Sequence, residues 1–269
     1  LRQQVERPQY GRVRTPQSGM LVSSPHQVAE YARCPQRVVL APPNWQPSRM
    51  SSEAEIIAGV IREMCTYTLK RGKRPPWRRV PGWVDKHFKL ECKRNPSLIQ
   101  TYKESLGVLT RLQRWYDKCY TPETHRYLPN LPIYIPLRDH HVFLDKIDML
   151  AIDAEGEITV FDFAEIQSSW TNSRLHIHTY LRADLVAAAR VWGFTVAGKE
   201  TPSQYTRFVI NKKGIFPARC TLTEQNIRWI KQTIPFILDG IGRGIRYTVV
   251  SDQCPTCPWR QRCPSRGDR

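Results

Sequence analysis

Three cysteines near the end of the chain have a spacing that is typical of metal ligands. Cys254, Cys257 and Cys263 form a C-x2-C-x5-C pattern. Thiolates this close together pair poorly as disulfides in a reducing compartment, and they are favourable ligands for zinc or for an iron–sulfur cluster. Either centre needs a fourth ligand, and Cys34, at the end of a short predicted helix over residues 26–33, is the best candidate. We expect ordinary packing roles for the remaining cysteines, Cys65, Cys92, Cys119 and Cys220.

A second set of residues could hold a divalent cation through carboxylate oxygens. Asp145 and Asp148 lie in an apolar, β-branched stretch that predicts a strand over residues 142–152. A carboxylate inside an apolar strand is costly unless it is paired or binds a metal. A second strand, predicted over residues 158–166, and the residue after it supply three more candidates: Asp162, Glu165 and Gln167. Carboxylates around Mg²⁺ or Mn²⁺, with a polar group beside the bound water, can hydrolyse a phosphodiester bond.

Strand alternation makes Asp162 and Glu165 competitors for this metal. Successive side chains point to opposite faces, so Asp162 shares a face with Ala164, whereas Glu165 shares the other face with Gln167. Without a bulge, only one of these pairs can face the ion. We prefer Glu165 and Gln167, with either aspartate of the preceding strand as partner, because Ala164 can neither orient water nor stabilise charge. The alternative, in which Asp162 is the ligand, stays open.

The elements that must position these residues form a mixed pattern of helices and strands. An antiparallel hairpin joins the two acidic strands through the connection Asp153–Gly156. Helices are predicted before and after it, over residues 53–71, 97–120, 175–192 and 222–241, and a further strand over residues 205–211. The pattern predicts an α+β fold. We divide it into a basic flexible arm, a helical part, a core and a cysteine tail, at residues 1–22, 23–128, 129–250 and 251–269.

The chain carries a large excess of positive charge. Lys and Arg outnumber Asp and Glu by 41 to 24, which gives a net charge of +17. Such a balance favours a polyanion such as DNA as partner. One basic segment is expected to contact phosphates through Lys70, Arg71, Lys73, Arg74, Arg78 and Arg79. No stretch is long and apolar enough to span a bilayer, and the first residues lack the apolar centre of a signal peptide, so we expect a cytoplasmic protein that acts without a membrane.

Both ends of the chain and the central hairpin resemble the iron-staple nucleases of the PD-(D/E)XK superfamily. The similarity rests on the sequence Tyr-Ala-Arg-Cys-Pro-Gln-Arg around Cys34, on the C-x2-C-x5-C tail, and on Leu144–Asp148, which resembles the motif G-x-x-D-R-x-D. This group includes RecB-like nuclease domains of the AddB type and the nucleases of CRISPR adaptation. The resemblance implies a restriction-endonuclease-like core and a structural [4Fe–4S] cluster on Cys34, Cys254, Cys257 and Cys263. A zinc site on the same residues is the alternative.

The acidic motif departs from the usual family pattern. Ala164 stands at the lysine position of the D-x-K motif, and Arg62 stands where a histidine on an upstream helix is usual. Glu165 and Gln167 resemble the E-x-Q variant of NotI-like restriction enzymes. The resemblance therefore implies a Mg²⁺- or Mn²⁺-dependent deoxyribonuclease with Asp145, Glu165 and Gln167 as catalytic residues and Asp145, Asp148, Asp162 and Glu165 as candidate metal ligands. The rival hypothesis is a catalytically inactive DNA-binding subunit of a larger DNA-processing, defence or transposition complex.

Overall fold

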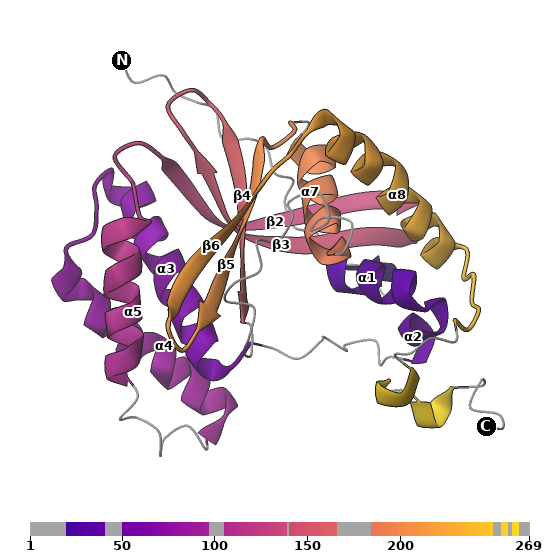
Figure 1. Ribbon diagram of the computed structural model, residues 1–269, viewed down its shortest axis with the longest axis horizontal. Coiled ribbons are helices and arrows are strands. Elements are labelled where there is room, and N and C mark those ends of the chain that lie inside the picture. Colours follow the sequence, from indigo (N-terminus) through magenta and orange to yellow (C-terminus); the bar gives the residue numbers. More distant parts are fainter. Residues whose placement is uncertain are drawn as a thin grey trace.

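The computed structural model describes one mixed β-sheet with helices on both faces (Figure 1). The described residues are 20–40, 50–96, 105–138, 140–165, 184–198, 200–249, 254–257 and 260–263. Helices α3, α4 and α5 lie on one side of the sheet, and helices α1, α7 and α8 lie on the other (Figure 1). The predicted α+β fold class is therefore confirmed. Within the described ranges, no helix combines the length and the apolar character needed to cross a bilayer.

The sheet is organised around its long central strand β3. The strands are β1 (Leu21–Ser23), β2 (Arg126–Arg138), β3 (His141–Ile152), β4 (Ile158–Glu165), β5 (Gln204–Asn211) and β6 (Gly214–Thr221). Their order is β1-β3-β4-β5-β6, with β2 paired to β3 along its other edge. The pairs β2–β3, β3–β4 and β5–β6 are antiparallel, whereas β1–β3 and β4–β5 are parallel. The predicted hairpin is thus present as β3 and β4.

Local sequence signals set the ends of the helices. The helices are α1 (Pro25–Arg33), α2 (Pro35–Leu40), α3 (Ser52–Arg71), α4 (Val80–Arg94), α5 (Ser105–Lys118), α7 (Leu185–Gly198) and α8 (Glu224–Gly242). At the start of α1, Ser24 and Gln27 form a reciprocal capping box. Helix α3 ends at Gly72, whose φ of 65° lies in the left-handed region that glycine adopts without strain.

Helix α4 and strand β6, like the short elements β1 and α2, are not predicted by the sequence. Helix α4 follows Pro75 and Pro76 and carries Pro81 in its first turn, so its start resembles a loop, and no helix is predicted over residues 80–94. Strand β6 contains Pro217, which lowers its strand signal, but β6 pairs only with β5, so this edge position tolerates the missing donor. The described part of the helix predicted over residues 175–192 begins at Leu185, and the residues from 175 to 183 lie outside the described ranges.

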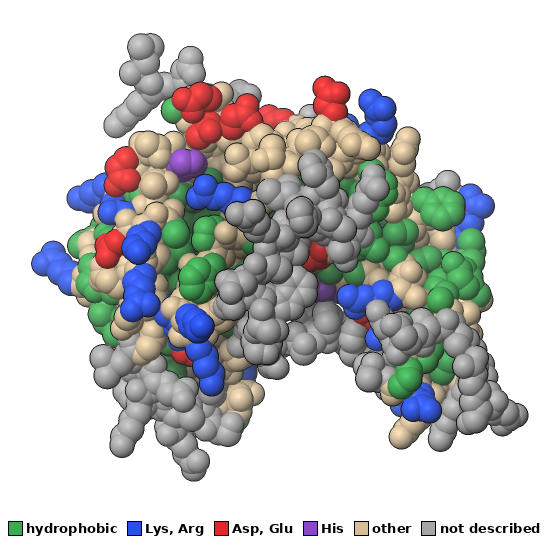
Figure 2. Space-filling view, in the orientation of Figure 1, with side chains coloured by type: hydrophobic (Ala, Val, Ile, Leu, Met, Phe, Trp, Pro, Cys, Tyr) green, Lys and Arg blue, Asp and Glu red, His purple; other side chains and the backbone are tan. Residues whose placement is uncertain are grey.

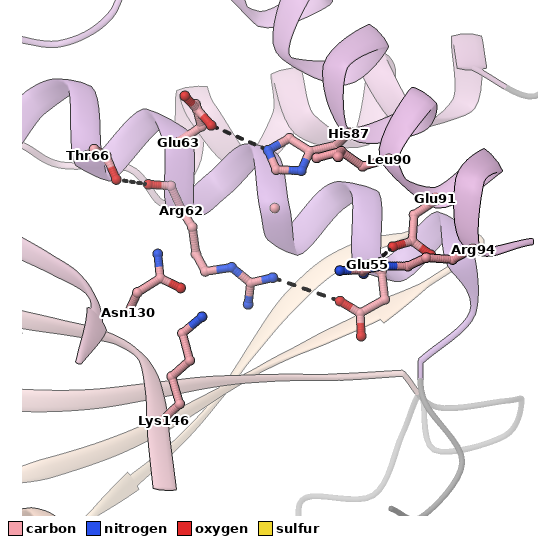
Figure 3. Close-up of a pocket in the computed structure, with 11 residues that line it drawn as sticks. Glu55, Arg62, Glu63, Thr66, His87, Leu90, Glu91, Arg94, Asn130 and Lys146 are labelled. Atoms are coloured by element: carbon pink, nitrogen blue, oxygen red, sulfur yellow. Dashed lines mark hydrogen bonds and ion pairs between the residues drawn. The ribbon is translucent and has the colours of Figure 1, made fainter. Parts of the chain in front are cut away.

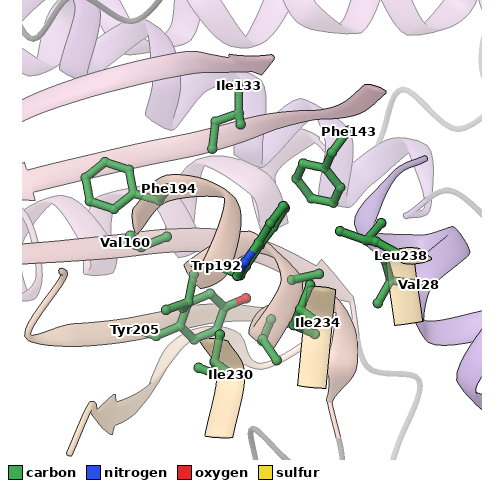
Figure 4. Close-up of a cluster of buried hydrophobic side chains, with 14 of the residues drawn as sticks. Val28, Ile133, Phe143, Val160, Trp192, Phe194, Tyr205, Ile230, Ile234 and Leu238 are labelled. Carbon is green, nitrogen blue, oxygen red and sulfur yellow. The ribbon is translucent and has the colours of Figure 1, made fainter. Parts of the chain in front are cut away.

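A hydrophobic cluster fills each side of the sheet. On the α7 side, Phe143, Trp192 and Tyr205 pack with residues of α1 and α8 (Figure 4). On the α3 side, a second cluster joins helices α3 and α5 to Met149 and Phe163. Because both faces of β3 and β4 are covered, a charged residue on either strand must find a partner within one of these two layers.

Candidate active site

Strands β3 and β4 are paired only near the turn that joins them. Their pairs run from Ile152↔Ile158 to Met149↔Phe161, and beyond Phe161 strand β4 continues along β5. At its other end, β3 pairs with β1 through residues 141–143. Among the described residues, positions 144–148 of β3 therefore have no strand partner on this edge, so the two strands form a fork. Asp145 and Asp148 lie on this open stretch.

Asp148 connects both arms of the fork to helix α3. Its Oδ2 accepts a hydrogen bond of 3.2 Å from the backbone N–H of Phe163, and its Oδ1 lies 2.5 Å from Nη1 of Arg62. Pairing between β2 and β3 is interrupted here, because Asn130 and Asp148 do not pair although their neighbours on both sides do. Asn130 has a φ of 57°, an uncommon left-handed conformation for a residue with a side chain. Such irregularities next to functional sites can re-aim a side chain.

Asp162 is held on the opposite side of the sheet by two arginines. Its side chain is 1% exposed and accepts hydrogen bonds from Arg190 Nη1 at 2.7 Å and from Arg207 Nε and Nη2, both at 2.9 Å. The hydroxyl of Tyr205 donates a further bond to it. Burial raises the pKa of Asp162, but the charges of Arg207 and Arg190 outweigh burial and hold that pKa well below its usual range. Both carboxylate oxygens of Asp162 are therefore already occupied.

Asp145 also faces the α7 side, but its contact with Arg190 is longer than that of Asp162. Its side chain is 6% exposed, and its Oδ2 lies 3.6 Å from Nε of Arg190, beyond hydrogen-bond distance. Neither of these two buried atoms has a hydrogen-bond partner. Burial raises the pKa of Asp145, and the charge of Arg190 opposes that shift. The two aspartates of β3 thus contact different layers, Asp145 through α7 and Asp148 through α3.

A charged pocket lies on the α3 side, beside Asp148. It has a volume of about 280 Å³ and is lined by α3, α4 and the β2–β3 pair through Glu55, Gly59, Arg62, Glu63, Thr66, His87, Leu90, Glu91, Arg94, Asn130 and Lys146 (Figure 3). Arg62, the partner of Asp148, projects into it. The side chain of Asp148 is 17% exposed, so this carboxylate is less enclosed than those of Asp145 and Asp162.

Ion pairs link the two helices across this pocket. Glu63 contacts Lys86 at 2.9 Å and His87 Nε2 at 3.5 Å, so its carboxylate is paired with residues of α4. Burial lowers the pKa of His87, partly offset by Glu63. Burial raises the pKa of Glu55, whose carboxylate lies 3.8 Å from Arg62. Gly59 allows the close approach of these helices, because a Cβ there would come within 2.5 Å of the His87 ring.

Two candidates of the predicted metal site, Glu165 and Gln167, lie at or beyond the edge of the described ranges. Glu165 is the last residue of β4 and pairs with Ile210 of β5. Gln167 lies outside the described residues, together with the rest of the segment that precedes Asp184.

Two cysteines from opposite ends of the chain contact the same residue. The backbone N–H of Val249 donates to Cys34 Sγ at 3.4 Å, and Cys254 Sγ lies 3.7 Å from the carbonyl oxygen of Val249. Short 3-10 turns form at Cys254–Thr256 and Arg260–Arg262, and Figure 1 draws them below α2. Across the described ranges, no three His, Cys, Asp or Glu side chains converge closely enough to share a metal ion. Thiolate sulfurs are suitable donors for the predicted cluster, and Cys34 and Cys254 share a contact with Val249, but the cluster itself stays a prediction.

The predicted basic segment divides into exposed and enclosed side chains. Lys70, Arg71, Lys73, Arg78 and Arg79 are exposed at the end of α3 and before α4. Arg74 instead donates to the carbonyl oxygens of Tyr116, at 2.7 Å, and of Tyr120. Its guanidinium carbon lies 4.3 Å from the centroid of the Tyr116 ring. Arg74 therefore ties this segment to the end of α5.

Sequence reasoning missed several residues of this region. The exposed lysines Lys86, Lys89 and Lys93 recur at helical spacing on α4, a signal that could have been recognised if the helix had been predicted. Figure 2 shows Lys and Arg side chains gathered over the helices at the lower left of the molecule. Arg190 and Arg207, the two arginines that bind Asp162, had no local signal in the sequence. A buried aspartate requires a partner, but the sequence does not say which arginine reaches it.

Comparison with known proteins finds similarity in structure and not in sequence. No protein-family model matches the chain. No curated protein matches it either. A solved structure from Eubacterium rectale, described as a "Putative exonuclease", aligns with a TM-score of 0.54 and 12% identity over 89% of this chain and 86% of that chain. The structure of SSO0001 aligns over 89% of this chain and 93% of that chain at 11% identity, with a TM-score of only 0.36. The first alignment shows a shared fold.

Proposed function

We propose that this protein is a divalent-metal-dependent deoxyribonuclease whose active site lies on the α3 side of the β3–β4 fork. The position of Asp148 carries the proposal. This carboxylate bridges the two strands where they separate, and its partner Arg62 lines a charged pocket. The net charge of +17 is consistent with a DNA substrate. The fold shared with the Eubacterium rectale protein is consistent with a nuclease as well.

The environments of the acids favour Asp148 over the other two aspartates as metal ligand. Asp162 would have to give up an arginine to bind a cation, and Asp145 is enclosed beside Arg190. Phe163 packs into the cluster on the α3 side, and the strand period of two assigns position 165 to the same face. The proposed site therefore combines Asp148 with Glu165 and Gln167 and leaves Asp162 as a structural residue.

Each residue has a defined task in the proposed reaction. A bound Mg²⁺ or Mn²⁺ would supply a water of lowered pKa and neutralise charge on the phosphate. Asp148 and Glu165 would hold the ion, and Gln167 would orient the attacking water. Arg62 neutralises Asp148 in the structure, and its planar guanidinium also suits a phosphate group.

Cleavage assays with matched variants test this assignment. Purified protein should degrade labelled single- or double-stranded DNA when Mn²⁺ or Mg²⁺ is present and leave it intact in chelator. We expect Asp148→Asn and Glu165→Gln each to lower kcat by roughly 100-fold or more, as loss of a group that acts in the transition state does. Asp117→Asn, on the exposed surface of α5, is the control and should cleave normally.

Two results would count against the nuclease. Folded wild-type protein that binds DNA but never cleaves it would support the DNA-binding subunit instead. Normal cleavage by Asp148→Asn together with complete loss in Asp162→Asn would move the metal to the α7 side of the sheet.

We also propose that Cys34, Cys254, Cys257 and Cys263 hold a structural [4Fe–4S] cluster. Support comes from the shared contacts of Cys34 and Cys254 with Val249, which is 215 residues from Cys34 in sequence. Four thiolates are the usual ligand set of such a cluster. Iron and sulfide analysis of protein purified without oxygen should find four of each per chain. Cys34→Ser should lose them and Cys92→Ser should keep them, whereas one zinc ion per chain would favour the zinc alternative.

A further inference from the structure

We propose that Lys146 and Arg62 together bind one phosphodiester group of a DNA strand, with Lys146 as the cation that position 164 does not provide. The inference rests on the proposed nuclease function and deepens it, since it names two residues that contact the substrate.

A cation is not needed at position 164, because this position faces a side of the sheet that already holds two arginines. Ala164 lies two residues after Asp162 and so shares its face. That face is the α7 side, where Arg190 and Arg207 already surround the Asp162 carboxylate. A lysine at position 164 would join these arginines. It would lie across the sheet from Asp148.

Lys146 lies on the α3 side of the sheet, the same side as Asp148. It lies two residues before Asp148 on β3, opposite Pro132 of β2, and it lines the pocket on the α3 side. Figure 3 shows its side chain extending from β3 toward Arg62 and the amide of Asn130. Lys146, Arg62 and Asn130 thus present hydrogen-bond donors to the same space.

Among the described residues that line the pocket, the ion pairs leave one cation, Lys146, available for an anion. Arg94 is paired with Glu91 at 2.7 Å, and Arg62 is paired with Asp148 and Glu55. Lys146 is exposed, and within the described part of the chain no carboxylate pairs with it. Two neighbouring cations repel each other, and a phosphate between them removes that repulsion. Lysine supplies a compact charge and arginine a planar pair of donors, so the two suit different oxygens of one phosphate.

Binding measurements test the phosphate contact without requiring cleavage. Fluorescence anisotropy with a labelled DNA duplex would be recorded in Ca²⁺ at several salt concentrations for wild type, Lys146→Ala, Lys146→Arg and Lys212→Ala. Lys212, exposed in the β5–β6 turn and outside the pocket, is the matched control. We expect Lys146→Ala to weaken binding several-fold and to lower the slope of log K against log salt by about 1. Lys146→Arg should restore most of the slope, and Lys212→Ala should resemble wild type.

Cleavage by the same variants separates this inference from the proposed function. If wild type cleaves DNA, Lys146→Ala should lower kcat by roughly tenfold or more with a smaller change in KM, because the contact strengthens as charge develops on the phosphate. If wild type does not cleave but Lys146→Ala lowers affinity and slope, the phosphate site stands and the nuclease proposal fails. A Lys146→Ala protein that binds with wild-type affinity and slope overturns the inference in either case.

Discussion

The two sides of the β3–β4 fork treat their carboxylates differently. On the α7 side, Asp162 is almost fully buried and is bound by two arginines and a tyrosine. On the α3 side, Asp148 is partly exposed and contacts Arg62, which lines a pocket. Lys146 also lines this pocket, and no carboxylate in the described part of the chain pairs with it. Buried charge with complete pairing stabilises one geometry, whereas exposed charge with incomplete pairing leaves room for a ligand. Under the proposed function, acidic residues close in sequence serve structure on one face and chemistry on the other.

The largest effect that would sharpen this comparison is on stability. Replacing Asp162 with Ala leaves Arg190 and Arg207 buried without their main counter-charge, so we expect a loss of about 3–5 kcal/mol in the free energy of unfolding. Asp148→Ala, on the more exposed side, should cost about 1 kcal/mol. Urea unfolding of both variants measures the difference. Equal losses would contradict the division into a structural and a functional side.

The next largest effect is a loss of stability in acid, through His26 on the α7 side. Burial, and then the charge of Arg190, lowers the pKa of His26 from 6.5 to about 4, with Arg207 adding to this shift and Asp162 and Asp184 opposing it. Between these two pH values the unfolded chain carries a proton that the folded chain lacks, so stability falls as the pH drops. We expect His26 to account for a loss of about 1–2 kcal/mol between pH 7 and pH 5. Urea unfolding at both pH values measures this loss, and His26→Gln should remove that share of it.

The smallest expected effects distinguish a structural arginine of the basic segment, Arg74, from an exposed one, Arg78. Arg74 is bound to carbonyl oxygens and an aromatic ring near the end of α5, so Arg74→Ala should lower the free energy of unfolding by about 1 kcal/mol. Arg78 is exposed, so Arg78→Ala should leave stability unchanged and lower the salt slope of DNA binding by about 1. Thermal unfolding and anisotropy distinguish these results. If both variants lost DNA affinity and neither lost stability, Arg74 would contact DNA, as the sequence predicted.

Prediction from sequence succeeded where the signal was local. The β-branched and aromatic residues of 142–152 and 158–166, with the turn-forming segment Asp153–Gly156 between them, were sufficient to predict the β3–β4 hairpin. The amphipathic pattern and glycine stop of α3 were sufficient as well. Helix α4 was missed because prolines and basic residues at its start resemble a loop, and its buried positions are few. Strand β6 was missed because it lies at the edge of the sheet and contains Pro217.

The sequence by itself determined which residue types could do chemistry and which of them share a strand face. Only the tertiary structure decided that Asp162 faces two arginines and that Asp148 pairs with Arg62, a residue that lines a pocket. The physical reason is that the period of a strand sets relative faces, while the layer that covers each face depends on how distant segments pack. Arg190 and Arg207 lie 28 and 45 residues from Asp162, on a helix and a strand that reach it only after β4 and β5 have paired in parallel.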